Sequence, residues 1–153
     1  LNGQPTGIAN TSGVSTPSGA FNWAAATTME QTAADAGGDD TGFGFVTTPA
    51  VRRLLKQRTV DAGGAGAPLW VSAQGGDSMA GRRANVTPVS PAATVLAGPW
   101  SDVVVPLWGT PMLEINPSDP ADFRAGIIQA RIWLSCNVGV QHPASWSVHS
   151  ALT

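Results

Sequence analysis

The clearest pattern in the chain is an alternation of apolar and polar positions between Ile128 and Val140. Every even-numbered position in this segment is apolar, whereas most odd-numbered positions are polar. A period of two over this length predicts a long strand with one face buried and the other in solvent. Cys136 falls on the apolar face, so we expect a small buried side chain with an unreactive thiol. His142 and Pro143 end the strand.

Two segments carry apolar residues at helical spacing. Residues 23–36 are rich in alanine and are followed by the glycine pair 37–38, which predicts a helix that stops there. In 49–58, three apolar residues fall at i, i+3 and i+4 and form one stripe. Thr48 followed by Pro49 fits an N-cap and a first-turn proline. We therefore expect two helices.

Shorter apolar runs between turn residues predict further strands. Five runs are expected as separate strands, at 43–47, 68–71, 84–89, 94–98 and 144–152. A hairpin is expected from 102–108 and 111–116, turning at Gly109 and Thr110. The segments 1–20, 59–67 and 72–83 are rich in glycine and small polar residues and are interpreted as irregular or loop structure. About two helices and six to eight strands place the chain in the α+β class.

Composition adds one unusual feature, a shortage of charge. Charged residues make up 12% of the 153 residues, about half the usual fraction of soluble domains. Either the surface is rich in small uncharged polar residues, or much of it faces other protein chains. The net charge of −2 argues against a nucleic-acid-coating surface, which needs a basic excess. No apolar run approaches the length of a membrane span.

Candidate catalytic and metal-binding groups are few. The chain has no G-x-S-x-G or phosphate-loop motif, and its one cysteine allows no internal disulfide. His142 and His149 lack a compact metal spacing and are interpreted as exposed or strand-end residues. Asp39 and Asp40 follow two glycines and fit a turn. We predict no catalytic residue, no metal and no cofactor, so the chain is not expected to be an enzyme. A small hydrolase that uses Asp39, Asp40 or a histidine is the alternative.

Four side chains are candidates for contacts between subunits. Arg82 and Arg83 form a basic pair in a segment expected to be a loop. They fit either a solvated surface or a contact with a carboxylate of another subunit. Trp100 lies near a turn and Trp133 on the polar face of the long strand. Aromatic residues outside a core often mark protein contacts, although packing within the chain is the alternative.

The order of the sequence elements resembles that of a known family. The relevant pieces are QPTGIAN (4–10), GFGFVTTP with AVRRLLK (42–56), AGRRANVTPVSP (80–91), VLAGPWSDVVVPLWGTPMLEIN (95–116) and DFRAGIIQARIWLSCNVGVQHPASWSV (122–148). Together they resemble the C-terminal part of tailed-bacteriophage major capsid proteins, whose fold is named after coliphage Hong Kong 97. Each piece is short and degenerate, and only their order is specific. The chain departs from the pattern at 98–101, where GPWS stands in place of G-D-F-s.

The resemblance implies a truncated Hong Kong 97-like fold. Residues 1–121 would be mostly A-domain, and 122–153 would link the P-domain sheet to it through the long strand. The N-terminal arm, the E-loop and the spine helix would be absent, in agreement with a start at Leu1 rather than methionine. Ring-closing contacts around a capsomer axis would lie in 59–67 and 72–83.

The function implied is that of a structural subunit of a phage or prophage shell. Copies would associate into hexamers and pentamers that enclose the genome, with scaffold, protease or portal proteins as partners during assembly. The protein would be made in the bacterial cytoplasm and located in the virion capsid, with no specific nucleic-acid recognition. Some family members cross-link covalently, but Gly126 and Trp133 stand at the aligned acceptor and acid positions, so no cross-linking is expected. The alternatives are an encapsulin-like compartment and a phage-associated tail or adhesin module.

Overall fold

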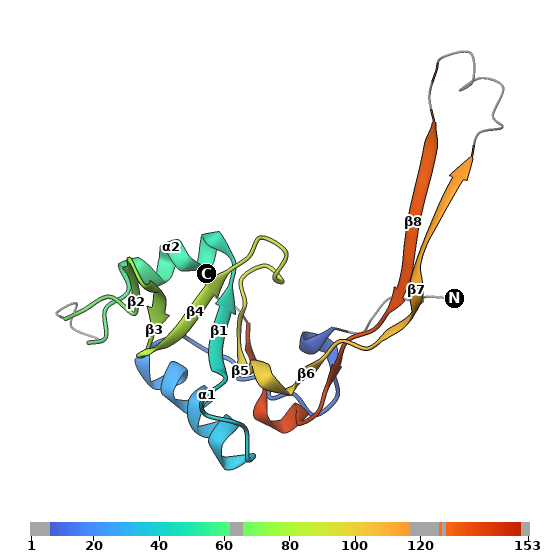
Figure 1. Cartoon of the computed structure of the whole chain (residues 1–153). Helices are drawn as coiled ribbons and strands as arrows, with labels where there is room; N and C mark the ends of the chain where they lie inside the picture. Colours follow the sequence, from blue (N-terminus) through green and yellow to red (C-terminus); the bar gives the residue numbers. More distant parts are fainter. Residues whose placement is uncertain (1–6, 62–65, 117–125, 127, 151–153) are drawn as a thin grey trace.

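The computed structural model describes residues 7–61, 66–116, 126 and 128–150. It shows a sheet with two helices, from which one long two-stranded hairpin projects (Figure 1). The chain enters this hairpin and returns from it through a narrow connection. Most of the hairpin therefore lies away from the body of the molecule. The α+β class is confirmed.

The body is built on a six-stranded sheet. Strands β1 and β4 run parallel, and every other neighbouring pair is antiparallel. In spatial order the strands are β10 (Ser147–His149), β5 (Val95–Pro99), β1 (Phe43–Thr47), β4 (Arg82–Val86), β3 (Gly76–Met79) and β2 (Trp70–Ala73).

Two capped helices pack on this sheet. Helix α1 (Trp23–Asp35) begins where the Asn22 side chain accepts a hydrogen bond from Ala25 N at 2.9 Å. Helix α2 (Pro49–Gln57) begins with Thr48 as the predicted N-cap, its hydroxyl accepting from Val51 N at 3.4 Å. Such caps satisfy backbone N–H groups that have no partner within the helix. Both predicted helices are confirmed.

Both helices cover the same face of the sheet. Met29 of α1 and Leu55 of α2 join one hydrophobic core with Phe45 of β1. Phe45 lies opposite Ala84 on one side and Ala97 on the other, and cross-strand partners share a sheet face. All five side chains are buried, which gives the body a closed core.

The other face of the sheet carries a tryptophan pair. The rings of Trp100 and Trp146 meet edge to face with centroids 4.9 Å apart. Trp146 is fully buried against Gly98, where an added Cβ would lie 2.4 Å from the Trp146 ring. Only glycine fits beneath this ring, so the sequence GPW at 98–100 is a packing feature of this chain.

A short two-stranded connection joins the body to the projecting hairpin. Strands β6 (Val103–Val104) and β9 (Gly139–Val140) pair antiparallel. At their base, buried Asp102 of the 3-10 helix η2 (Trp100–Asp102) lies 3.0 Å from Nδ1 of His142. We call the hairpin beyond it, β7 (Leu107–Asn116) with β8 (Gln129–Cys136), the arm.

Residues 72–83, expected to be a loop, instead form most of a β-meander. Strands β2 and β3 pair as a hairpin, and β3 continues into β4 through Ala80 and Gly81. Both residues have positive φ, 51° and 79°, as a two-residue primed turn requires. Alanine is uncommon in that conformation, which explains why the prediction was wrong. Arg82 and Arg83 therefore lie on a strand.

The prediction of a hairpin that turns at Gly109 and Thr110 is also wrong. Residues 107–116 are one strand, and its pairing with β8 shifts register between Trp108 and Met112. The positive φ of Gly109, 79°, accompanies this bulge, as glycine often does.

The long strand expected at 128–140 is divided in two. Strand β8 ends at Cys136 and pairing resumes at β9. The larger difference is burial, because every residue of β8 is exposed, on both faces. Cys136 is exposed too, so the prediction of a buried thiol is wrong. The strand expected at 144–152 is a 3-10 turn, η3 (Pro143–Ser145), followed by β10. Residues 122–125, 127 and 151–153 lie outside the described residues.

Candidate self-association surfaces

One face of the arm is apolar along its whole length. Leu113 lies opposite Ile132, and Ile115 lies opposite Ala130. Since cross-strand partners share a face and neighbours along a strand alternate, seven side chains form what we call the apolar arm face: Leu107, Leu113, Ile115, Ala130, Ile132, Leu134 and Cys136. The larger members are strongly exposed, at 59% for Leu113 and 70% for Ile132. Contiguous apolar surface of this kind marks an interaction site on a soluble protein.

The opposite face of the arm mixes aromatic and charged side chains. Arg131 of β8 donates from Nε to Oε2 of Glu114 at 3.2 Å, and Trp133 donates from Nε1 to Oε1 of the same carboxylate at 3.3 Å. Hydrogen bonds from Arg131 and then Trp133, together with the charge of Arg131, lower the pKa of Glu114. The hydrogen bond to Glu114 holds the Trp133 ring in place, while 46% of Trp133 is exposed to solvent.

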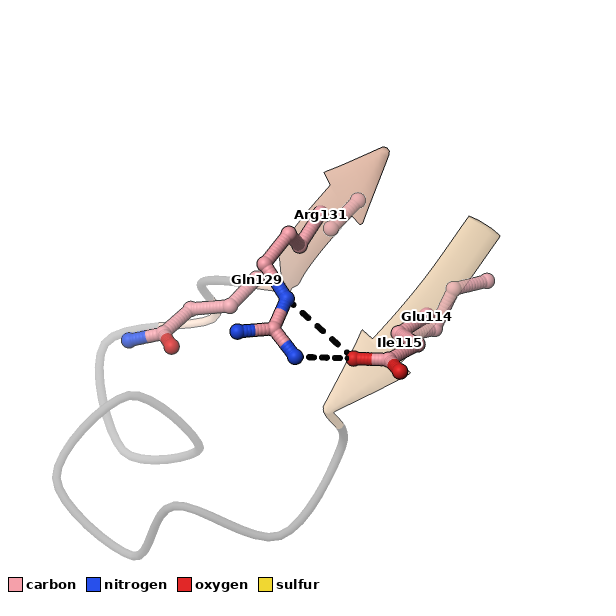
Figure 2. A pocket seen from close by; sticks show the side chains of 5 residues that line it. Glu114, Ile115, Gln129 and Arg131 are labelled. Atoms are coloured by element: carbon pink, nitrogen blue, oxygen red, sulfur yellow. Dashed lines mark hydrogen bonds and ion pairs between the residues drawn. The ribbon is translucent and has the colours of Figure 1, made fainter. Parts of the chain in front are cut away.

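An open hollow of about 590 Å³ lies at the far end of the arm, lined by Glu114, Ile115, Gln129, Ala130 and Arg131. Figure 2 shows the Arg131 guanidinium extending from β8 toward the Glu114 carboxylate on β7. The charged groups of the hollow are thus paired with each other. General acid–base or nucleophilic chemistry needs a base placed beside a reactive group, and these five side chains do not provide that arrangement.

Arg82 is held within its own chain. Its Nε donates to Oε1 of Glu30 on α1 at 2.7 Å, its Nη1 to the Asp40 carbonyl at 3.4 Å, and its Nη2 to both carboxylates. The hydrogen bonds to Glu30 and then Asp40 raise the pKa of Arg82. This clamp ties the start of β4 to α1 and to the turn after it. The inter-subunit role predicted for Arg82 stays a prediction.

Arg83 and Trp100 are brought together on the sheet face opposite the helices. Both line a hollow of about 240 Å³, next to Gly44 and Asn85. Nothing in the sequence pattern placed these two candidates side by side. They are connected by the register of the parallel strands β1 and β4, which places Arg83 opposite Gly44. The Trp100 ring in turn lies against Gly44.

The candidate acid–base groups differ in burial and in hydrogen-bond partners. His149 is buried, with its ring edge to face with Phe21, and burial lowers its pKa. His142 is exposed and pairs with Asp102. Hydrogen bonds from Thr41, above all from its backbone N–H, lower the pKa of Asp39.

In the described ranges, no group of three or more His, Cys, Asp or Glu side chains is placed to hold a metal ion. No helix within them has the length and apolar character needed to cross a membrane.

Comparisons with known proteins identify the fold. No family model and no curated protein matches the sequence. Among solved structures, a virus-like particle from Pyrococcus furiosus matches with a TM-score of 0.59 and 13% identity, over 94% of this chain and 58% of that one. The capsid of an empty GTA particle matches with a TM-score of 0.59 and 16% identity, over 96% and 55%. The chain thus spans a little over half the length of these two chains. Its fold is that of capsid proteins.

Proposed function

We propose that this chain is the greater part of a structural shell subunit of a phage or prophage capsid, with a Hong Kong 97-like fold. Copies associate into hexamers and pentamers that enclose the genome, and the subunit acts without catalysis or cofactor. The exposed apolar arm face is the observation that carries the proposal. The capsid-type fold and the resemblance in element order support it.

The arm explains why association is needed. A two-stranded hairpin is marginally stable alone in water and gains stability when a face is covered. Leu113 and Ile132 are more than half exposed in a single copy, so covering them removes apolar surface from water. In the proposed subunit, 1–121 is mostly A-domain and 122–153 links it to the P-domain. The rest of the subunit contains an E-loop, a spine helix and the N-terminal arm of the capsid family, which is a different segment from the β7–β8 arm described above.

Scaffold, protease or portal proteins are the partners proposed for assembly, with synthesis in the host cytoplasm and final location in the virion.

Three alternatives make different predictions, two of them about neighbouring genes and one about enzymatic turnover. An encapsulin-like shell predicts a neighbouring gene for a cargo enzyme, whereas a phage capsid predicts portal, terminase or protease genes. A tail or adhesin module predicts neighbouring tail genes. A hydrolase predicts turnover that is lost on alanine substitution of His142 and His149 without unfolding.

The test of self-association is to charge the apolar arm face without breaking the arm. Leu113→Glu combined with Ile132→Lys places opposite charges across a strand pair, which preserves the hairpin. Sedimentation over a concentration series should show small oligomers for the unaltered chain and monomers for the double variant. Val89→Lys alters a side chain that is 88% exposed in the body and serves as the control.

One result would contradict the proposal, and another would correct its account of the further segments. Equal association of the double variant and the unaltered chain would show that the apolar arm face is not an interface. Regular closed particles of the 153-residue chain, seen by electron microscopy, would contradict the need for the further segments.

A further inference from the structure

The hollow beside Arg83 has the composition of a carboxylate site. Gly44 is among its lining residues, and an added Cβ there would lie 3.1 Å from the Arg83 carbonyl oxygen and 3.4 Å from the Trp100 ring. Arg83 and Asn85 stand on β4 at one side of it, and Trp100 forms another side. A guanidinium and an amide are donors suited to a carboxylate, and the guanidinium can bind it through two parallel hydrogen bonds.

The aromatic wall of this hollow is fixed in place. Trp100 Nε1 donates to the Gly44 carbonyl at 3.2 Å, and Trp100 N donates to the Gly42 carbonyl at 3.0 Å. The Trp146 ring meets the Trp100 ring edge to face. Trp100 nevertheless stays 36% exposed. A rigid, partly exposed aromatic beside a cation is typical of the residues that contribute most to protein interfaces.

Among the residues that the structure describes, Arg83 differs from its neighbour Arg82 in having no acidic partner. Arg82 is paired with Glu30 and Asp40 on the helix side of the sheet. Arg83 points to the other face, and within the described ranges no ion pair of Arg83 is found. Its side chain is exposed and therefore available to a partner.

We infer that the Arg83–Asn85–Trp100 hollow receives a carboxylate from a second copy of this chain, and that Asp35 supplies it. The inference rests on the proposed self-association and names one of its contacts. Asp35 is the last residue of α1, is exposed, and has no ion pair in the described part of the chain.

The position of Asp35 favours a cationic partner. A carboxylate in the last turn of a helix lies against the negative end of the helix dipole. Helix α1 has no basic residue in that turn to offset this. A guanidinium from another copy would relieve the repulsion and would also neutralise Arg83.

The geometry of the body makes this a contact between copies. Helix α1 covers one face of the sheet and the hollow lies on the other. A contact between Asp35 and Arg83 therefore joins two different patches of two copies. Such a heterologous contact generates rings when the rotation closes, as capsomers require.

Charge reversal tests the pair. Arg83→Glu and Asp35→Lys should each weaken self-association about tenfold, measured by sedimentation at low salt. The combination Arg83→Glu with Asp35→Lys should restore it, because the charges are exchanged but remain complementary. Arg53→Glu reverses another exposed charge, on α2, and should leave association within about twofold. Thermal unfolding of each variant establishes that the body is folded.

The outcomes separate this inference from the proposed function. If Arg83→Glu behaves like Arg53→Glu while the variant of the apolar arm face still dissociates, the inference is wrong and the shell role stands. If Arg83→Glu weakens association but exchange with Asp35 does not restore it, the assignment of Asp35 is overturned. A chain that stays monomeric at every concentration overturns both.

Discussion

The body and the arm use the same sequence pattern with opposite results. In β1, Phe43 and Phe45 alternate with other residues and are buried beneath two helices. In β8, Ile132 and Leu134 alternate in the same way and are exposed. Alternation therefore reports which face of a strand is apolar, but not whether the cover for that face lies in the same chain. An apolar face that this chain leaves exposed is available for assembly.

The largest effect that tests this comparison is a cavity in the body. Phe45→Ala removes a fully buried ring and should lower the free energy of unfolding by about 3–5 kcal/mol. Ile132→Ala shortens a side chain that is 70% exposed and should change it by about 0.5 kcal/mol or less. Urea unfolding, followed by tryptophan fluorescence, measures both.

The comparison would break if the two variants lost similar stability in the urea measurement. That result would mean that Ile132 is covered in solution. Repeating the measurement at higher protein concentration then distinguishes cover by a second copy, which makes the loss depend on concentration.

A smaller effect is expected from crowding a glycine. Gly98→Ala places a Cβ within 2.4 Å of the Trp146 ring, and overpacking of this kind should cost about 1–3 kcal/mol. Gly139 of β9, by contrast, has no atom within 4 Å of an added Cβ. Gly139→Ala is the matched control and should leave the melting temperature nearly unchanged. Equal melting temperatures for the two variants would show that Trp146 can move away from Gly98.

The parts of the fold that follow from local sequence were predicted well. Helix α2 was predicted correctly because three features agree. Thr48 is suited to an N-cap, Pro49 is suited to the first helical turn, and the apolar residues that follow have helical spacing. The turn at Ala80 and Gly81 was missed because its residues do not reveal the conformation that the sheet imposes on them. The single strand β7 was missed because Gly109 serves a bulge, which carries the same residue signal as a turn.

The candidate contact residues show a second limit of sequence. Arg82 and Arg83 are adjacent and chemically identical, yet a strand directs them to opposite faces. One forms a clamp with Glu30 and Asp40, and the other lines an open hollow. Their roles separate only once they are known to lie on a strand. Likewise, the element order suggested a shell protein, but nothing in it showed that the arm would stand clear of the body.

The smallest effect is a difference in pH response between the two regions. Burial lowers the pKa of His149, in the body, below its ordinary value of 6.5. The unfolded chain then binds a proton at higher pH than the folded one, so stability is full above about pH 6.5 and falls as the pH drops toward the folded pKa. The arm responds at lower pH, because the pKa of Glu114 is lowered from 4.5 by Arg131. The stability that the Glu114–Arg131 pair contributes is present above about pH 4.5 and is lost as the pH falls through the lowered pKa of Glu114.

Unfolding by urea at about pH 7.5, 6.5 and 5.5 separates these contributions, since histidine is the side chain whose ordinary pKa falls within that range. The unaltered chain should lose stability between the first and the last condition. His149→Gln, which keeps a polar side chain of similar size but does not titrate, should show a smaller loss. An equal loss in both proteins would show that the burial of His149 is not the cause of the response, and the contrast in pH response between body and arm would lose its basis.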